Sequence, residues 1–176
     1  EANSITINPQ KVLGITKTSS ILIVKDIKIL QETFQTGLPY LSSDEILINR
    51  GELGLQGSRP AEIIKLWLGM KFLGISGIKK VLKASINKRI LLEQNLDEDK
   101  FNIYSGPLHI ISFVPKKLSI KKSDDWTQKA QKTLIKHNFM LSRPFYQNKY
   151  FLRAVLGNFN TKDSHIQNLS KILNEI

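Results

Sequence analysis

The sequence predicts a mixed α/β chain that ends in a small α+β unit. Runs of β-branched and aliphatic residues near the start have the composition of strands, and two stretches between residues 61 and 90 repeat apolar residues at helical spacing. After residue 98, strand and helix patterns alternate twice, which suits a small sheet covered on one face. We therefore expect three regions, which span residues 1–59, 60–97 and 98–176.

The first expected strand leads directly into a proline and a lysine. The β-branched run from Ile5 to Ile7 favours a strand, Pro9 ends it, and Lys11 follows at the exit into a loop, where functional groups collect. Lysine forms Schiff bases when its surroundings leave part of the amine neutral, and the Asn8 side chain offers amide donors to an anion. The alternative is a solvated surface lysine, as most lysines after a proline turn are.

A second strand and a short helix follow. Residues 19–25 have the composition of a buried strand, and residues 26–34 fit a helix with Asp26 as its N-cap. We expect the apolar side of this helix to cover a face of the sheet, with Ile27, Leu30 and Phe34.

A long loop separates these elements from the connecting helices. Periodicity fails between Thr36 and Gly57, and loops of this length inside compact folds often act as lids. Gly57 and Ser58 stand before a helix, where exposed backbone amides can bind a phosphate. The alternative, equally consistent with the residues, is an ordinary capped helix entrance.

The connecting region should contain two helices. Pro60 suits the first turn of a helix over 61–72, in which Trp67 lies on the apolar side and belongs to the core, and Gly74 suits the stop. A second helix should follow Gly77 and carry lysines on its outer side.

The last region should form the α+β unit. Ser105-Gly106-Pro107 separates two strand candidates, and the acidic pair Asp124 and Asp125 favours a helix start. The expected strands are 101–104, 108–114, 139–142 and 150–156, and the last helix begins at Thr161.

Arg153 is the one charged residue on an otherwise apolar strand. Phe151 and Val155 share its face and aliphatic residues occupy the other, so we expect Arg153 to be buried. A buried arginine needs an anion, and its planar fork suits a carboxylate held by two hydrogen bonds. Without further information, a bound carboxylate and an internal salt bridge to the chain's own acids are equally consistent with the pattern.

Composition excludes several kinds of site. The chain has 41% hydrophobic residues, enough for a core, and no cysteine, so disulfides and thiolate chemistry are excluded and a cytoplasmic location is the natural expectation. Its three histidines lack close spacing or carboxylate companions, so we expect no metal and no Ser-His-Asp site. No apolar run approaches ~18 residues, so we expect no membrane span.

The net charge of +11 raises the question of nucleic-acid binding. The lysines occur singly or in pairs among acidic and apolar residues, without an arginine-rich stripe or an aromatic platform. A lysine-rich solvated surface is therefore favoured over a nucleic-acid partner.

Three blocks of the chain resemble the group II pyridoxal-phosphate-dependent amino acid decarboxylases, which include the glutamate, aromatic amino acid, histidine and diaminobutyrate enzymes. Asn8-Pro9-Gln10-Lys11 is similar to the family's Asn-Pro-His-Lys segment. The two other blocks match in the same order along the chain, and they are Leu55-Gln56-Gly57-Ser58-Arg59 with Lys65-Leu66-Trp67-Leu68, and Tyr150 to Asn158.

The resemblance implies a fold-type-I enzyme and a role for each site residue. Lys11 would carry pyridoxal 5'-phosphate as a Schiff base, Asn8, Gln10 and Ser58 would help bind the cofactor, and Arg153 would hold the substrate carboxylate. The implied reaction is decarboxylation of an amino acid to its amine by a homodimer. Residues 1–59 would be the end of the cofactor-binding domain with a mobile loop, and the chain would be a C-terminal portion of the enzyme.

Two departures from the family keep other functions open. Gln10 replaces a histidine and cannot become cationic. Several family members have a proton-donating tyrosine in the loop, but no tyrosine lies between Leu41 and Pro60. The alternatives are a pyridoxal enzyme that yields an aldehyde, a non-catalytic remnant or interaction module of the same fold, and, least favoured, a basic nucleic-acid-binding domain.

Overall fold

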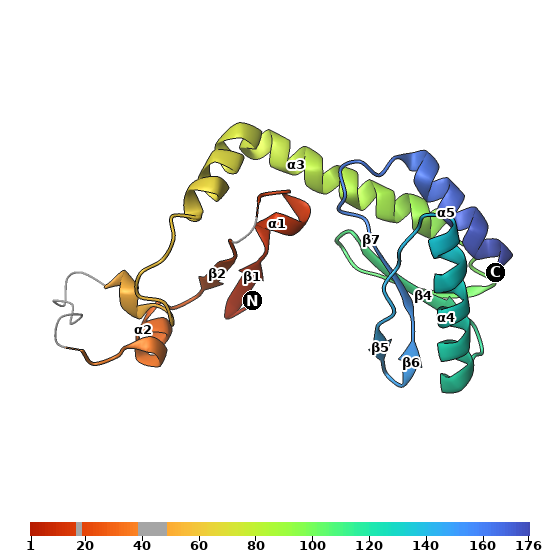
Figure 1. Ribbon diagram of the computed structural model, residues 1–176, viewed down its shortest axis with the longest axis horizontal. Helices are drawn as coiled ribbons and strands as arrows, with labels where there is room; N and C mark the ends of the chain where they lie inside the picture. The colour runs from red at the N-terminus through yellow and green to blue at the C-terminus, as the bar shows by residue number, and fades with distance from the viewer. Residues whose placement is uncertain (17–18, 39–48) are drawn as a thin grey trace. The chain divides into compact units, whose positions relative to one another are not determined.

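A computed structural model describes residues 1–16, 19–38 and 49–176, which divide into two compact units, Glu1–Leu73 and Gly74–Ile176 (Figure 1). Helix α3 (Ile63–Asn95) passes through the division, and Gly74 is its non-helical residue, with φ 60° and ψ 176°. Glycine alone adopts such angles readily. The predicted interruption at Gly74 is therefore confirmed, but the helix resumes at Ile75, so the expected restart after Gly77 is wrong.

The first unit contains one antiparallel strand pair. Strand β1 (Ser4–Ile7) pairs with β2 (Ile21–Val24), with Ser4 opposite Val24 and Ile7 opposite Ile21. Apolar residues on both strands remain 40–52% exposed, and they are Ile5, Ile7, Leu22 and Ile23. The two strands were predicted, but the expected burial of the second strand is wrong within this chain.

Short helices flank the strand pair. Helix α1 (Pro9–Val12) begins with its proline in the first turn, where a missing N–H costs nothing. Helix α2 (Lys28–Phe34) starts after Asp26, whose Oδ1 accepts a 2.9 Å bond from the N–H of Lys28. No residue of α2 is buried, so the expectation that it covers the sheet is wrong.

The expected lid loop falls partly on residues 39–48, which lie outside the described residues. On either side of that gap, the buried Glu52 in the 3-10 helix η2 (Arg50–Glu52) accepts bonds from Thr36 N, at 3.3 Å, and Thr36 Oγ1, at 3.2 Å. These bonds hold the two ends of the loop together.

The first turns of α3 approach Ile15 closely at Gly69. An ideal Cβ on Gly69 would lie 2.1 Å from Cδ1 of Ile15, so the glycine permits the close approach of this buried side chain. Leu66 is buried as well, whereas Trp67 is 57% exposed. The prediction that Trp67 belongs to the core is wrong.

The second unit contains a three-stranded antiparallel sheet in the order β3-β4-β7. The strands are β3 (Phe101–Ser105), β4 (Ile110–Pro115) and β7 (Leu152–Val155). The register places Tyr104 opposite Ser112 and Ser112 opposite Arg153, so these three residues form a row on one face of the sheet.

The described helices of the second unit cover the other face of this sheet. The later turns of α3, helix α4 (Ile120–Lys136) and helix α5 (Asp163–Glu175) pack there and enclose the core (Figure 1). Leu92, Phe113, Leu134, Leu152 and Leu173 are fully buried in it. Both expected helices of this region form, although Ser119 provides the N-cap of α4 and the helix therefore begins before the acidic pair at 124–125.

A β-hairpin of two short strands, β5 (Phe145–Tyr146) and β6 (Lys149–Tyr150), extends from the sheet. Gln147 and Asn148 form its turn with positive φ angles of 45° and 58°, as a tight hairpin requires. The strand expected over 139–142 is reduced to one bridge, from Ser142 to Arg153.

Candidate functional site

Lys11 lies on α1, one turn after the strand that was expected to present it. Asn8 is the N-cap of this helix, yet its side chain makes no capping bond. Lys11 is exposed, and no hydrogen bond or ion pair joins its amine to any of the described residues. The helix thus presents an amine and an amide, both uncommitted within the described part of the chain, less than one turn apart.

Gln10 lies between these two residues and is half-buried. Its Oε1 is buried and has no hydrogen-bond partner. A buried polar atom without a partner costs about 1–3 kcal/mol, and the oxygen and nitrogen of an amide exchange places by a half-turn of the side chain. Gln10 therefore has one buried amide end whose hydrogen-bonding capacity is unused.

Ser58 is exposed and lies apart from these contacts. No hydrogen bond or ion pair between described residues joins it to Asn8, Gln10 or Lys11. Its neighbour Arg59 donates from Nε to the carbonyl oxygen of Gln56 at 3.0 Å. The structure brings Asn8, Gln10 and Lys11 together, and it does not bring Ser58 to them by any such bond.

Arg59 lines a hollow of about 910 Å³ in the first unit. Ser19 lines the same hollow, and its buried Oγ has no partner among the described residues. A guanidinium and a hydroxyl can together hold an anion. Neither residue was predicted to be a site residue, although Arg59 directly follows Ser58 in the block that resembles the decarboxylases.

Arg153 belongs to the second unit and differs from its expectation in one respect. The residue lies on the predicted strand, but its side chain is exposed because the face of the sheet that carries it has no helix over it. The expected burial is therefore wrong. The guanidinium donates from Nε to Ser142 Oγ at 3.0 Å and forms no ion pair with the described acids, so the internal salt bridge is absent from the described part of the chain.

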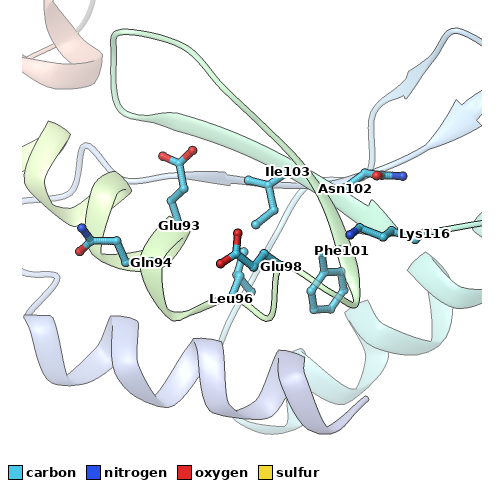
Figure 2. Close-up of a pocket in the computed structure, with 8 residues that line it drawn as sticks. All are labelled: Glu93, Gln94, Leu96, Glu98, Phe101, Asn102, Ile103 and Lys116. Atoms are coloured by element: carbon cyan, nitrogen blue, oxygen red, sulfur yellow. The ribbon is translucent and has the colours of Figure 1, made fainter.

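A second hollow, of about 530 Å³, lies beside the end of α3 (Figure 2). Glu93 and Glu98 stand on one part of its rim, and Lys116 on another. The Glu93 carboxylate already has two partners. It forms an ion pair with Arg89 at 2.5 Å and accepts a hydrogen bond of 2.7 Å from Ser105 Oγ. These bonds lower the pKa of Glu93, with Ser105 contributing most. None of the sequence-predicted site residues lines this hollow.

Neither a metal site nor a membrane-spanning helix occurs in residues 1–16, 19–38 and 49–176. No group of three or more histidine, aspartate or glutamate side chains there is arranged to hold a metal ion. No helix in the same residues has the length and apolar character needed to cross a bilayer.

The family model for the pyridoxal-dependent decarboxylase conserved domain matches residues 1–114, which is more than half of the chain. The chain belongs to the pyridoxal-dependent decarboxylase family. Pyridoxal phosphate is the cofactor of this family, and the matched residues include Asn8, Gln10, Lys11 and Ser58.

Solved structures share the fold over nearly the whole chain. Oryza sativa TDC, crystallised with PLP and tryptamine, superposes with a TM-score of 0.80 at 16% identity, over 98% of this chain and 39% of that one. Rhodiola rosea 4-hydroxyphenylacetaldehyde synthase superposes with a TM-score of 0.79 at 19% identity, over 98% of this chain and 36% of that one. Mouse CSAD in its apo form superposes with a TM-score of 0.69 at 22% identity, over 99% of this chain and 40% of that one.

These similarities define the fold as that of the fold-type-I decarboxylases. The chain spans about two-fifths of the length of these proteins. Within that part, the residues of α1 fit the cofactor, since an amine for covalent attachment stands beside two amides with unused capacity.

Proposed function

We propose that this chain is part of an enzyme that decarboxylates an amino acid, with Lys11 as the residue that holds pyridoxal phosphate covalently. The observation that carries the proposal is the uncommitted Lys11 amine, one turn from the unused amide of Asn8, in a chain of the decarboxylase family. Asn8, Gln10 and Ser58 are proposed to bind the phosphate of the cofactor, and Arg153 the carboxylate of the substrate.

The reaction exchanges a carboxylate for a proton on one carbon atom. When bound, the cofactor supplies the electron sink that accepts the bonding pair as carbon dioxide leaves. Lys11 would hold the ring of the cofactor, and the amides of Asn8 and Gln10 would hold its phosphate. The Arg153 fork holds the carboxylate in one geometry by two parallel hydrogen bonds, which reduces the entropy lost on reaching the transition state.

The product is an amine in the leading proposal; in the second it is an aldehyde, formed by oxidative deamination in which dioxygen would be the oxidant, with release of ammonia and hydrogen peroxide. Two observations favour keeping the second: residues 41–59 contain no tyrosine, and one structural neighbour is named as an aldehyde synthase. Homodimeric assembly, as the resemblance implies, belongs to both forms of the proposal. An assay that follows amine and aldehyde separately distinguishes them.

Cofactor titration followed by borohydride reduction tests the assignment of Lys11. Reduction converts the covalent attachment into a stable lysine adduct, and peptide mapping then identifies the modified residue. We expect one dominant adduct at Lys11, absent from Lys11→Ala and unchanged in Lys28→Ala, which removes an exposed lysine of α2. Adducts spread evenly over the surface lysines would contradict the proposal and favour a non-catalytic member of the fold.

A further inference from the structure

We propose that Ser142 is a positioning residue for Arg153, and that it restricts the guanidinium to binding a carboxylate through its two terminal nitrogens. This inference rests on the proposed function, in which Arg153 holds the substrate carboxylate. It concerns a residue that the sequence did not single out and that acts only through Arg153.

Ser142 and Arg153 are joined by four hydrogen bonds. Two of these bonds join the backbones. The N–H of Arg153 donates to the carbonyl oxygen of Ser142 at 2.9 Å, and the N–H of Ser142 donates to the carbonyl oxygen of Arg153 at 3.1 Å. The serine hydroxyl donates to the carbonyl oxygen of Arg153 at 3.3 Å and accepts from its Nε at 3.0 Å. The hydroxyl is therefore oriented by the backbone that carries the guanidinium, and it fixes one edge of that group.

The bond to Nε decides which donors remain for a ligand. A guanidinium binds a carboxylate either through Nε and one terminal nitrogen or through both terminal nitrogens. Because Nε is committed to Ser142, only the second mode leaves two parallel bonds available. No other hydrogen bond of the Arg153 side chain is formed within the described residues, so both terminal nitrogens are free to bind a ligand.

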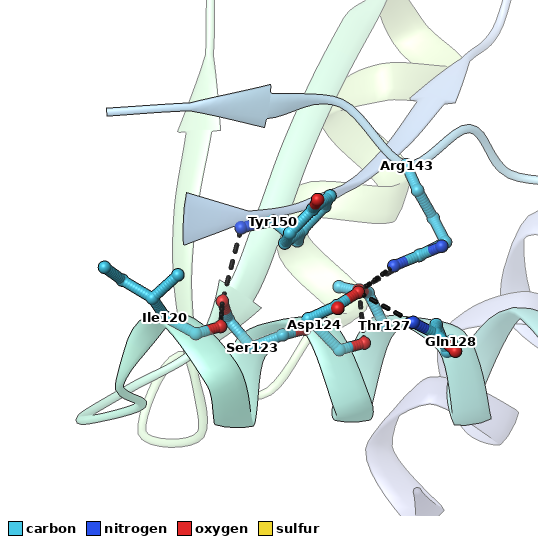
Figure 3. A network of polar contacts seen from close by, with 7 residues as sticks. All are labelled: Ile120, Ser123, Asp124, Thr127, Gln128, Arg143 and Tyr150. Atoms are coloured by element: carbon cyan, nitrogen blue, oxygen red, sulfur yellow. Dashed lines mark hydrogen bonds and ion pairs between the residues drawn. The ribbon is translucent and has the colours of Figure 1, made fainter. Parts of the chain in front are cut away.

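The segment that carries Ser142 is itself held to α4 by Arg143 (Figure 3). The Arg143 guanidinium pairs with the Asp124 carboxylate, donates from Nε to Thr127 Oγ1 at 3.1 Å and lies 5.2 Å from the ring centre of Tyr150.

The opposite strand is attached to the same helix. The N–H of Tyr150 donates to Ser123 Oγ at 3.2 Å, and Ser123 is fully buried. Both the segment of Ser142 and β6, which leads into the strand of Arg153, are thus anchored to α4, which gives Ser142 a fixed place even though its own side chain is exposed.

The bond itself is tested in the chain by nuclear magnetic resonance of the arginine Nε–H groups. We expect Ser142→Ala to speed solvent exchange of the Arg153 Nε–H by roughly 3- to 10-fold, the size of one lost hydrogen bond, and Ser142→Thr to retain the slow exchange. Ser105→Ala, which removes a serine bonded to Glu93 instead, serves as the matched control. Equal exchange in wild type and Ser142→Ala would overturn the inference.

The consequence for binding is tested in the holoenzyme that contains this chain. We expect Ser142→Ala to raise KM for the amino acid by roughly 3- to 10-fold with little change in kcat, and to leave inhibition by the product amine unchanged because the amine lacks the carboxylate. Arg153→Lys tests the proposed function separately. If Arg153→Lys raises KM and Ser142→Ala does not, positioning by Ser142 is wrong; if Arg153→Lys has no effect on KM, the carboxylate role of Arg153 is wrong.

Discussion

The two units of this chain treat their apolar residues in opposite ways. In Gly74–Ile176, fifteen buried residues form one continuous core between a sheet and three helices. In Glu1–Leu73, the described part buries few apolar side chains, Ile15 and Leu66 among them, and leaves many exposed on both faces of the strand pair. An isolated strand pair is marginal in water, and apolar residues on both faces are typical of strands inside a larger sheet.

Stability is concentrated in the second unit, whereas the proposed site residues are divided between the two units. The second unit has the core expected of a body that folds on its own, and it positions Arg153. The first unit carries Lys11 and the amides beside it on elements with little packing of their own. Substitutions should therefore have large effects on stability in one unit and small ones in the other.

The largest expected difference comes from truncating one apolar side chain in each unit. Phe113→Ala removes a fully buried ring that packs edge-to-face on Phe101 at 5.7 Å, and should lower the free energy of unfolding by about 3–5 kcal/mol. Leu22→Ala removes a side chain that is 52% exposed, and should cost under about 0.5 kcal/mol. Urea unfolding followed by circular dichroism measures both, and equal losses would contradict the division into a packed and an unpacked unit.

A smaller effect is expected at the residue where the units divide. Gly74→Ala places a side chain at φ 60° and ψ 176°, a combination that should cost about 1–3 kcal/mol of stability. Gly77→Ala lies in the regular part of the same helix and should stabilise it by up to about 1 kcal/mol. The midpoint of thermal unfolding compares the two variants. A stabilising Gly74→Ala would mean that this backbone conformation is not required.

The sequence predicted features that depend on neighbouring residues better than features that depend on residues far apart along the chain. Lys11 and Asn8 are three residues apart, so a local pattern and a family resemblance were enough to predict them as site residues, and their roles stay a prediction. The strand that carries Arg153 was also predicted, but its burial was not, because burial depends on which face of the sheet the helices cover. Ser142 was missed for a related reason, since its pairing with Arg153 is made across a hairpin and leaves no local signal.

Boundaries failed where two neighbouring signals competed. The acidic pair at 124–125 suggested the start of a helix, but Ser119 accepts a bond from the N–H of Lys122 and begins α4 more than one turn earlier. Asp124 instead pairs with Arg143, so the charge that suggested a helix start serves the contact that fixes the hairpin.

The burial of Trp67 was predicted wrongly because helical spacing indicates which residues share a face of the helix without indicating what covers that face.

The smallest expected effect is a pH dependence confined to the second unit. The Ser105 hydroxyl, and then Arg89, lower the pKa of Glu93 below its ordinary value near 4.5. A carboxylate whose pKa is lowered on folding contributes stability that is present above its unfolded pKa and is lost as pH falls through the folded one.

The wild-type chain should therefore lose more stability than Glu93→Gln between about pH 5 and 3, and the two should converge at the acid end. Ser105→Ala removes the largest cause of the shift and should reduce this pH dependence, whereas Ser170→Ala, whose hydroxyl bonds to a backbone carbonyl in α5, should not. Urea midpoints measured across that pH range provide the test. A difference between wild type and Glu93→Gln that stays constant with pH would show that the bonds to Glu93 join α3 to β3 without lowering the pKa of this carboxyl group.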